Sequence, residues 1–390
     1  MLNWLRNVPL LIPLCCVAIT VSGLCGLHRA DQLYGESRLF ERQLIWTALS
    51  WPAMLLMTVL PWRRLRNVGP AVFVVSLGLL ILVLFMPAIN GSRRWIPLGL
   101  MDFQPSEPAR LAFIMVLASW LMYRENHRTI RGLVPPFVIT LLPLLLILRE
   151  PDLGTAMLFL PILYAMLFAA GARVTHLVVA SLIGVAFLPL LWQQMTSEQK
   201  SRIVMLFNQA DGTTAPSGDG FHLHQSKQVL ALGGIHGSIW NEEPLVDDAT
   251  AWSLPAARTD FILSIIGEHY GLAGVSLVLL LYAVLVWRGL RAALRTQDPW
   301  GRLVAVGIVT MIGAQAVINS GMTVGLMPIT GMTLPFCSYG GSSLLSFSVA
   351  AGLLMNIDMR PGYDVGPAPF HQQRRQVGRD TLRALKQWLP

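Results

Sequence analysis

Asp260 stands at the start of a long apolar run, in Arg-Thr-Asp-Phe-Ile-Leu-Ser-Ile-Ile-Gly-Glu-His-Tyr-Gly (258–271). An ionisable side chain at membrane depth is costly, so such residues are usually retained for a task. A partly buried carboxylate near cations is a candidate general base, because burial and charge tune its pKa. A local ion pair with Arg258 is the alternative, and the sequence alone slightly favours it. Glu268 lies about 12 Å deeper on a helix that rises about 1.5 Å per residue, and fits a structural or gating role.

Cations and an aromatic residue fill the stretch Gly-Ser-Arg-Arg-Trp-Ile-Pro-Leu-Gly (91–99). Arg93 and Arg94 stand on a side of the membrane where the charge pattern disfavours basic residues. A planar guanidinium can bond two phosphate oxygens, so both residues, with Trp95, are candidates for binding an anionic substrate. A lipid-headgroup anchor with an interfacial tryptophan is an equally good interpretation.

The stretch Gln-Pro-Ser-Glu-Pro-Ala-Arg (104–110) has the composition of a helix start, with Ser106 as the expected N-cap. Arg110 faces an apolar segment and needs a partner, which Glu107 can supply from three residues earlier on the same helix face. A structural ion pair is the favoured interpretation of Glu107 and Arg110, and substrate binding is the second.

A charged break, Arg-Glu-Pro-Asp-Leu-Gly-Thr-Ala (149–156), separates two apolar runs. Asp152 is expected to cap the helix that follows, and capping alone explains it well. Glu150 and Asp152 are also candidates for binding a cation or a hydroxyl.

Polar residues of a second loop, Phe-His-Leu-His-Gln-Ser-Lys-Gln (221–228), suit the recognition of a sugar or a phosphate. The candidates for substrate binding are Gln225, Ser226 and Lys227. The His-x-His pair in this stretch has no carboxylate or cysteine nearby, so we predict no metal site here. Three glycines that follow mark flexible or closely approached backbone: Gly233, Gly234 and Gly237.

Residues 319–343 are rich in glycine, proline and hydroxyl side chains, too broken for a helix and too apolar for a free loop. Irregular backbone at membrane depth is tolerated where it lines a cavity or is buried in protein. We expect a re-entrant wall of a site, with Ser338 and Tyr339 as candidate substrate contacts. A buried connector between helices is the alternative.

The elements that must position these residues are membrane helices. The chain has 390 residues, is 54% hydrophobic and only 13% charged, which is typical of a polytopic membrane protein. Its four cysteines have neither disulfide-framework nor metal spacing. Ten apolar runs have lengths suited to a bilayer: 8–27, 42–61, 70–89, 106–123, 133–148, 153–171, 175–193, 259–286, 302–321 and 341–358.

Charge predicts the orientation. One set of short loops, with the C-terminal tail, carries 18 basic and 5 acidic residues, whereas the rest of the chain carries 11 and 16. The positive-inside rule therefore places both termini in the cytoplasm and the loops 90–105, 194–258 and 322–340 outside. The net charge of +8 thus reflects topology, and nucleic acid is not an expected partner. The polar tail, 361–390, ends in a stretch, 381–389, that fits either an amphipathic helix on anionic lipid or a frayed end.

These stretches together resemble the SEDS family of cell-wall polymerases, of the RodA and FtsW type. The similarity runs from about residue 90 to 358 and is carried by segments 104–110, 258–271 and 331–343. The short tail and residues 97–107 are more similar to the RodA branch. We therefore expect an all-α polytopic membrane protein with about ten transmembrane helices, a membrane domain over 1–360 and a large extracytoplasmic loop between helices 7 and 8.

The resemblance implies a peptidoglycan glycosyltransferase that polymerises lipid II at the outer face of the bacterial cytoplasmic (inner) membrane, in elongation, shape maintenance or division. It makes Asp260 the essential carboxylate and places Trp95, Glu107 and Arg110 in sensitive motifs, although Arg258 replaces the family's usual histidine. It implies a nascent glycan strand and a class B penicillin-binding protein as partners, besides membrane lipid. No cofactor is certain, and a divalent cation, Mg or Mn, is a candidate.

Two other classes of function fit the same residues. A lipid II flippase would use Asp260, Glu268 and Arg110 to line a path across the bilayer. A non-catalytic scaffold would organise a penicillin-binding protein and would not need Asp260.

Overall fold

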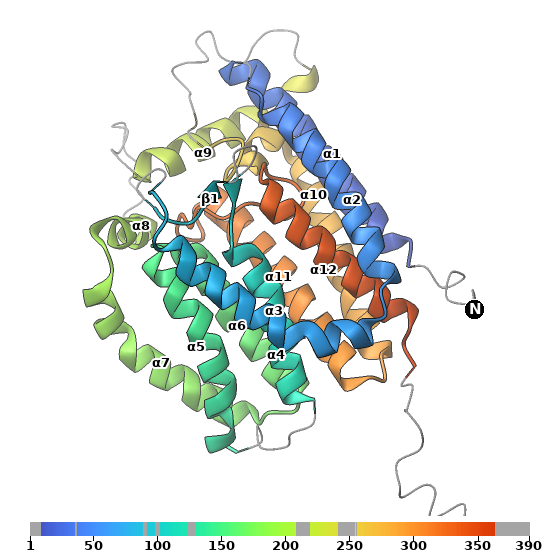
Figure 1. Ribbon diagram of the computed structural model, residues 1–390. Helices are drawn as coiled ribbons and strands as arrows, with labels where there is room; N and C mark the ends of the chain where they lie inside the picture. Colours follow the sequence, from blue (N-terminus) through green and yellow to red (C-terminus); the bar gives the residue numbers. More distant parts are fainter. Residues whose placement is uncertain are drawn as a thin grey trace, which may run out of the picture.

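All ten apolar runs coincide with helices in the computed structural model, which describes residues 9–35, 37–88, 92–97, 102–122, 129–207, 219–240, 254 and 256–362. The helices are α1 (Leu11–Tyr34), α2 (Leu39–Val59), α3 (Trp62–Val83), α4 (Ser106–Leu121), α5 (Val134–Arg149), α6 (Leu153–Ala169), α7 (Val174–Gln194), α10 (Ile262–Arg295), α11 (Pro299–Thr323) and α12 (Gly341–Met359) (Figure 1). The predicted all-α membrane fold is confirmed. The tail beyond residue 362 lies outside the described residues.

Seven helical segments of the described chain are long and apolar enough to cross a bilayer. They are α1, α3, the 3-10 turn η3 (Arg131–Leu133) with α5, α7, α10, α11 and α12, whereas α6 is apolar but shorter. The outward surface confirms a membrane environment: α7 buries only Leu177, and its Val178, Leu182 and Leu190 are exposed. A helix in water would turn charged and polar side chains outward instead.

Helix ends differ from the ends of the apolar runs. α1 continues to Tyr34, α3 begins at Trp62, and α10 extends to Arg295. Hydrophobicity marks the part of a helix that suits lipid, whereas backbone hydrogen bonding continues into polar residues at the membrane surface. Asp152 caps α6 as predicted, accepting from the Thr155 amide at 3.0 Å. The N-cap of α4 is Pro105, so the prediction of Ser106 was wrong by one residue: Ser106 is already helical, and its buried hydroxyl has no partner within the described part of the chain.

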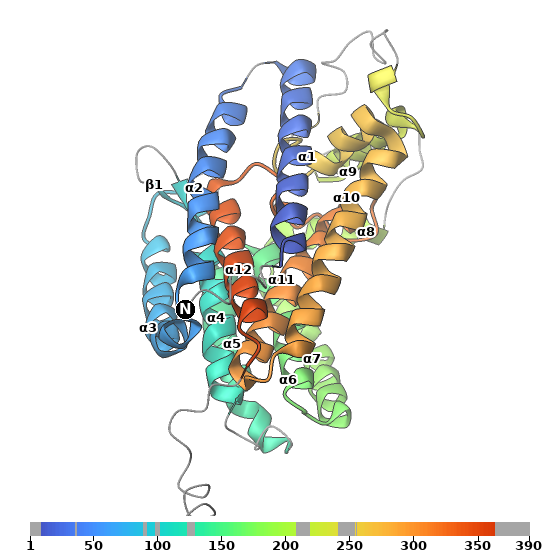
Figure 2. The same ribbon diagram turned by 90° about the vertical axis from the view of Figure 1, so that its right-hand side faces the viewer.

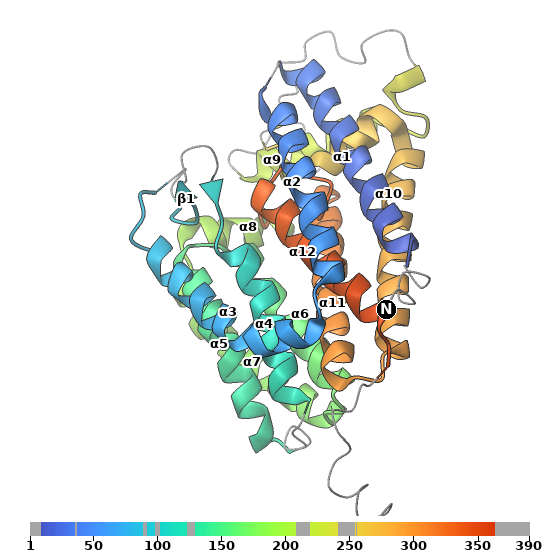
Figure 3. The same ribbon diagram turned by 45° about the vertical axis from the view of Figure 1, so that its right-hand side comes forward.

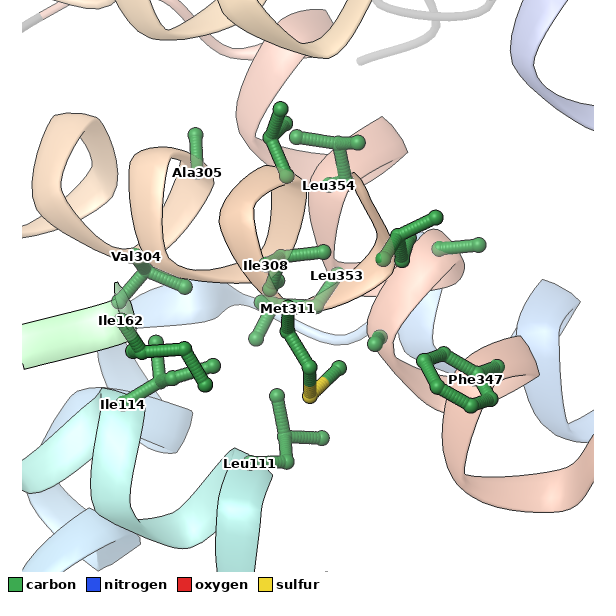
Figure 4. Close-up of a cluster of buried hydrophobic side chains, with 14 of the residues drawn as sticks. Leu111, Ile114, Ile162, Val304, Ala305, Ile308, Met311, Phe347, Leu353 and Leu354 are labelled. Carbon is green, nitrogen blue, oxygen red and sulfur yellow. The ribbon is translucent and has the colours of Figure 1, made fainter. Parts of the chain in front are cut away.

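The core is built around α11, which packs against α4, α6, α10 and α12. Side chains from these helices interdigitate in Figure 4, where Ile114 and Ile162 meet Val304 and Ile308, and Leu353 closes the far side. All five are fully buried. Close packing of this kind holds the long helices in one relative arrangement, and so gives the connections at their ends a rigid base.

The connections predicted as outer loops gather at one end of the bundle (Figure 1, Figure 2 and Figure 3). Strands β1 (Ile96–Pro97) and β2 (Asp102–Phe103) pair antiparallel within the first connection. The second, predicted as a loop, contains α8 (Ser197–Phe207), α9 (Asp219–Gly233) and the 3-10 turn η4 (Ser238–Trp240). The third, residues 324–340, has no regular structure and is largely buried, as predicted.

α10 is interrupted at Gly271, where φ is 64° and ψ is −161°. The break receives backbone from the end of α9, because the Leu272 amide donates to the Gly234 carbonyl at 2.9 Å. A Cβ at Gly233 would lie 1.9 Å from the Gly267 carbonyl oxygen, and one at Gly237 would lie 2.3 Å from the His269 carbonyl oxygen, so the predicted close approach is confirmed at these two glycines. Gly234 has a positive φ of 52° instead. The first part of α10, residues 262–270, is thereby a separate short helix packed on α9.

We expect Gly271→Ala to destabilise the protein. A side chain there would adopt a backbone conformation that costs about 1–3 kcal/mol, and its Cβ would lie 2.4 Å from the Ile235 carbonyl oxygen. The apparent melting temperature of the purified protein should fall. Gly184→Ala in α7 is the control, since a Cβ there meets nothing within 4 Å. Equal melting temperatures for the two variants would contradict the proposed close contact.

Candidate active site

Asp260 is presented by a tight turn that immediately precedes α10. The Ala256 carbonyl accepts from the amides of Asp260 and Phe261, at 2.9 and 3.2 Å. The Asp260 side chain is partly buried, and its Oδ2 lies 3.6 Å from the point that a Cβ on Gly331 would occupy. Segment 324–340 is therefore a wall beside this carboxylate, and glycine at position 331, with φ 68°, permits the close approach.

Arg258 is engaged elsewhere, so the local Arg258–Asp260 pair favoured by the sequence is not the arrangement observed. The Arg258 guanidinium binds Asp31 Oδ1 through Nε at 2.8 Å and the Gly35 carbonyl through Nη2 at 2.8 Å. Arg258 thus ties the turn to the end of α1. Asp260 is left to face other cations.

Arg202 of α8 is the nearby cation that the sequence reasoning missed. Its Nη1 lies 3.9 Å from the same Cβ position of Gly331, so Arg202 and Asp260 converge on one point of the wall. A signal was available: Arg202, like Arg93 and Arg94, is a basic residue in a segment assigned to the outer side. Because residues 194–258 were predicted as a loop, the prediction did not include helix α8, which places Arg202 near Asp260.

The charge on Asp260 is balanced between burial and these cations. Burial raises the pKa of the Asp260 carboxyl to about 6, against the lowering effects of a Thr259 hydrogen bond and of Arg202 and Arg94; Asp152 adds a further small rise. A carboxylate with a pKa near 6 is ionised at pH 7 and still basic enough to accept a proton.

Arg94 organises a second polar cluster next to Asp260. It donates to the carbonyls of Glu150 and Pro151, at 3.2 and 2.8 Å, and lies 3.9 Å from Asp152 Oδ2. Gln104 also donates to Asp152 Oδ2, at 3.4 Å. Burial first, and then Asp152, raises the pKa of Glu150 to about 8, so its carboxyl is mostly neutral at pH 7. The cluster therefore presents Arg94 as its cation and Asp152 as its anion.

Glu107 and Arg110 form the predicted ion pair inside the bundle. Arg110 is 1% exposed, also donates to Gln315, and lies over the Phe347 ring. Gln315 in turn donates to the Thr333 carbonyl at 2.7 Å. The pair on α4 is thus connected, by way of Gln315 on α11, to segment 324–340, and it stabilises this segment from the interior of the bundle.

The polar residues predicted in the second loop lie on α9, where Ser226 links three helices. The Ser226 hydroxyl bonds Ser264 at 2.8 Å and the Thr323 carbonyl at 3.0 Å, linking α9 to α10 and α11. Gln225 is buried, and its Oε1 has no partner among the described residues, whereas Lys227 is partly exposed.

The remaining predicted contacts lie around the wall and the first connection. The Ser338 hydroxyl accepts from the Leu334 amide at 2.8 Å, and the Tyr339 amide donates to the Arg258 carbonyl at 3.0 Å. Ser338 is buried and Tyr339 partly exposed. Arg93 is exposed and turns back to the Leu84 carbonyl, whereas Trp95 is partly buried. Tyr339 and Trp95 are thus the two aromatic candidates with surface available for a sugar.

Glu268 has the structural role expected from sequence. It is 4% exposed and receives two bonds from Arg29 of α1, at 2.7 and 3.0 Å. Arg29 also donates to Ser238 of η4. This partly buried, bidentate pair fastens the short first part of α10, and therefore Asp260, to α1 and η4.

A resident metal is not supported by the donor groups. Within the described parts of the chain, no three His, Cys, Asp or Glu side chains are placed to hold an ion. Asp152 is already used by Thr155 and Gln104. The side chains of the described residues therefore do not form a protein-held metal site.

Fold and site together define a multi-pass helical membrane protein with a partly buried carboxylate facing cations at one end of its bundle. The sequence model for FtsW, RodA and SpoVE, described as cell cycle protein, matches residues 7–362. This chain therefore belongs to the FtsW/RodA/SpoVE family, and the predicted SEDS membership is confirmed.

Curated relatives come from several branches of the family. Stage V sporulation protein E of Bacillus subtilis (strain 168) is 37% identical over 86% of this chain and 91% of its own length. The probable peptidoglycan glycosyltransferase FtsW of Geobacter metallireducens is 34% identical over 92% and 96%. The peptidoglycan glycosyltransferase MrdB of Escherichia coli (strain K12) is 32% identical over 82% and 85%. The identities are similar, so the preference for the RodA branch stays a prediction.

Solved structures agree in fold. A chain from a structure described as "Structural coordination of polymerization and crosslinking by a peptidoglycan synthase complex" superposes with a TM-score of 0.78, at 30% identity over 90% of this chain and 98% of that one. The rod shape determining protein RodA of Thermus thermophilus superposes with a TM-score of 0.66, at 28% identity over 90% and 97%.

Proposed function

We propose that this protein is a peptidoglycan glycosyltransferase that polymerises lipid II, with Asp260 as its general base. The names of its relatives support the activity. The observation that carries the residue assignment is the convergence of Asp260 and Arg202 on Gly331, within 4 Å of one point, with Arg94 close by. Such a pairing of a base with cations suits a reaction in which a hydroxyl attacks and a diphosphate leaves.

The proposed step is a single displacement. The acceptor 4-hydroxyl attacks the anomeric carbon of the donor sugar while Asp260 takes the hydroxyl proton. The bond from that carbon to the diphosphate oxygen breaks, and its electron pair leaves with the polyprenyl diphosphate. Attack from the opposite face inverts the anomeric centre.

Arg202 and Arg94 are the proposed diphosphate ligands. The diphosphate is a good leaving group, so the main catalytic requirement is stabilisation of the charge it carries away. Arginine side chains held by the protein supply it without reorganisation, and Arg94 is held by two backbone carbonyls. A divalent cation, if one takes part, is proposed to bind together with the diphosphate of the substrate. Loss of activity on chelation by EDTA would support this proposal.

The proposed location is the bacterial cytoplasmic (inner) membrane, with the site on the outer face. Arg288, Arg291 and Arg295 lie at the opposite end of α10 from Asp260, which supports a cytoplasmic position for that end. The synthase complex among the similar structures supports a partner that cross-links the strands, for which we propose a class B penicillin-binding protein.

A reconstituted assay separates this function from its alternatives. Purified protein in liposomes receives labelled lipid II, and gels report polymer while leaflet-specific labelling reports transfer across the bilayer. Polymer formation that requires Asp260 supports the proposal. Transfer without polymer would identify a flippase. In cells, wall growth that does not require Asp260 would identify a scaffold.

The rate of polymerisation should fall as the pH is lowered through about 6, because protonated Asp260 cannot act as a base. Its carboxyl is ionised above that pKa, so the rate should rise from pH 5 and level off above pH 7. Initial rates of lipid II consumption measure this limb. The gel-filtration elution volume at pH 5 controls for unfolding. A rate that does not change from pH 5 to 7 would contradict the assignment of Asp260 as the base.

A further inference from the structure

One buried amide joins the two segments that form the site. Asn319 of α11 is fully buried, and its Nδ2 donates to the Asp260 carbonyl at 2.8 Å and to the Met332 carbonyl at 2.6 Å. Asp260 carries the candidate base, and Met332 follows Gly331 in the wall. Both hydrogens of a single amide are thus used to connect the turn before α10 to segment 324–340.

We propose that Asn319 is a positioning residue for the reaction, which sets the separation of the Asp260 carboxylate from the Gly331 wall and Arg202. This inference rests on the proposed function and extends it, because Asn319 acts through Asp260 and touches no substrate.

The geometry favours positioning over simple stabilisation of the fold. The Asp260 carbonyl precedes the N-cap of α10, Phe261, so the helix itself provides no partner for it. The Asn319 bond fixes the main chain at the residue whose side chain reacts. α11 packs against α4, α6, α10 and α12 in the core, so the amide anchors both segments to a well-packed helix.

The remaining atoms of Asn319 show that the amide is aimed at these two carbonyls. Its Oδ1 is buried and has no hydrogen-bond partner among the residues that the structure describes. Leaving a buried acceptor unpaired is unfavourable, so the orientation observed is retained for the two N–H bonds. An isosteric apolar residue would avoid that penalty and would also lose both connections.

Asn356 provides a matched control within the same chain. It is also a fully buried asparagine, on α12, and its Nδ2 donates to two carbonyls, Met57 at 2.7 Å and Leu60. These bonds join α12 to the end of α2, in a part of the bundle that does not contact Asp260. Asn356→Ala therefore removes the same two N–H bonds, together with one that Asn356 Oδ1 accepts from Arg360, without touching the site.

The experiment compares wild type, Asp260→Asn, Asn319→Ala and Asn356→Ala in detergent with purified lipid II. Displacement of a reacting group by about 1 Å can reduce a rate about 100-fold, so we expect that loss in kcat for Asn319→Ala, with KM changed less than about threefold. Asn356→Ala should keep its kcat within about twofold of wild type while both variants lose thermal stability.

The pH profile supplies a readout that a purely structural role would not move. Burial is the main cause of the raised Asp260 pKa, and a turn released from the wall becomes more hydrated. The acid limb of kcat should therefore shift to lower pH in Asn319→Ala and stay in place in Asn356→Ala. Should Asn319→Ala not fold, Asn319→Ser, which keeps one donor, should show about a tenfold loss and the same shift.

Two results are distinguishable. A folded Asn319 variant with the kcat and acid limb of Asn356→Ala would overturn the positioning role while leaving the polymerase intact. Full activity in Asp260→Asn, or no polymer from wild type, would instead overturn the proposed function.

Discussion

Asp260→Asn should lower the rate of lipid II polymerisation by about 100- to 10,000-fold, the contribution expected of a positioned general base. The amide is nearly isosteric with the carboxylate, so the turn, its Ala256 bonds and the Asn319 contact should all remain. What is lost is the capacity to accept the proton of the attacking hydroxyl. Gel analysis of labelled products measures the effect, with KM for lipid II reported separately.

Asp298→Asn is the control for this substitution. Asp298 caps α11 at the opposite end of the bundle, accepting from the Gly301 amide at 3.4 Å, and asparagine caps helices about as well as aspartate. The control should polymerise at the wild-type rate. Equal losses in both variants would show that the Asp260 effect is not specific to the site.

Arg202→Ala should lower kcat/KM about 100-fold. Hydrogen bonds to charged groups contribute about 1.5–3 kcal/mol each, and a factor of ten corresponds to about 1.4 kcal/mol. Arg202→Lys should recover part of the loss, since it keeps the charge without the planar fork. Arg202 also lowers the Asp260 pKa, so its removal should shift the acid limb of the rate profile to higher pH.

Lys200→Ala makes the same change of charge on the same helix. Lys200 lies over the Trp192 ring, 6.0 Å from its centroid, and is not among the groups that influence Asp260. Its kcat/KM should stay within about twofold of wild type. A similar loss for both substitutions would mean that α8 contributes only general positive charge.

The helical fold could be predicted because its cause is local. A run of about 20 apolar residues can satisfy its backbone in lipid only as a helix, and each of the ten runs coincides with one. α8 and α9 were missed because short, mixed segments at the membrane surface have no such constraint. Their helical form depends on packing, as in the contact of Gly233 with Gly267.

Most residues of the site could be predicted from the sequence, but of their contacts only those between close neighbours on one helix could be. Glu107 and Arg110 are three residues apart, so helix geometry alone predicted their ion pair. Arg258 and Asp260 are also neighbours, yet Arg258 binds Asp31, 227 residues away in the chain. Arg202 reaches the site from α8, and Asn319 joins it through bonds to Asp260 and Met332. No local rule indicates contacts of that kind.

Sequence by itself therefore determined the membrane fold and the family, and it made Asp260 a candidate base, since each depends on composition, period or motif. Only the tertiary structure decided which charges Asp260 faces. Arg258 binds Asp31 of α1 instead of Asp260, and α8 places Arg202 near Asp260. The core helix α11 binds the main chain of Asp260 through Asn319. Charge interactions depend on distance in space, and that distance is set by the packing of helices far apart in the chain.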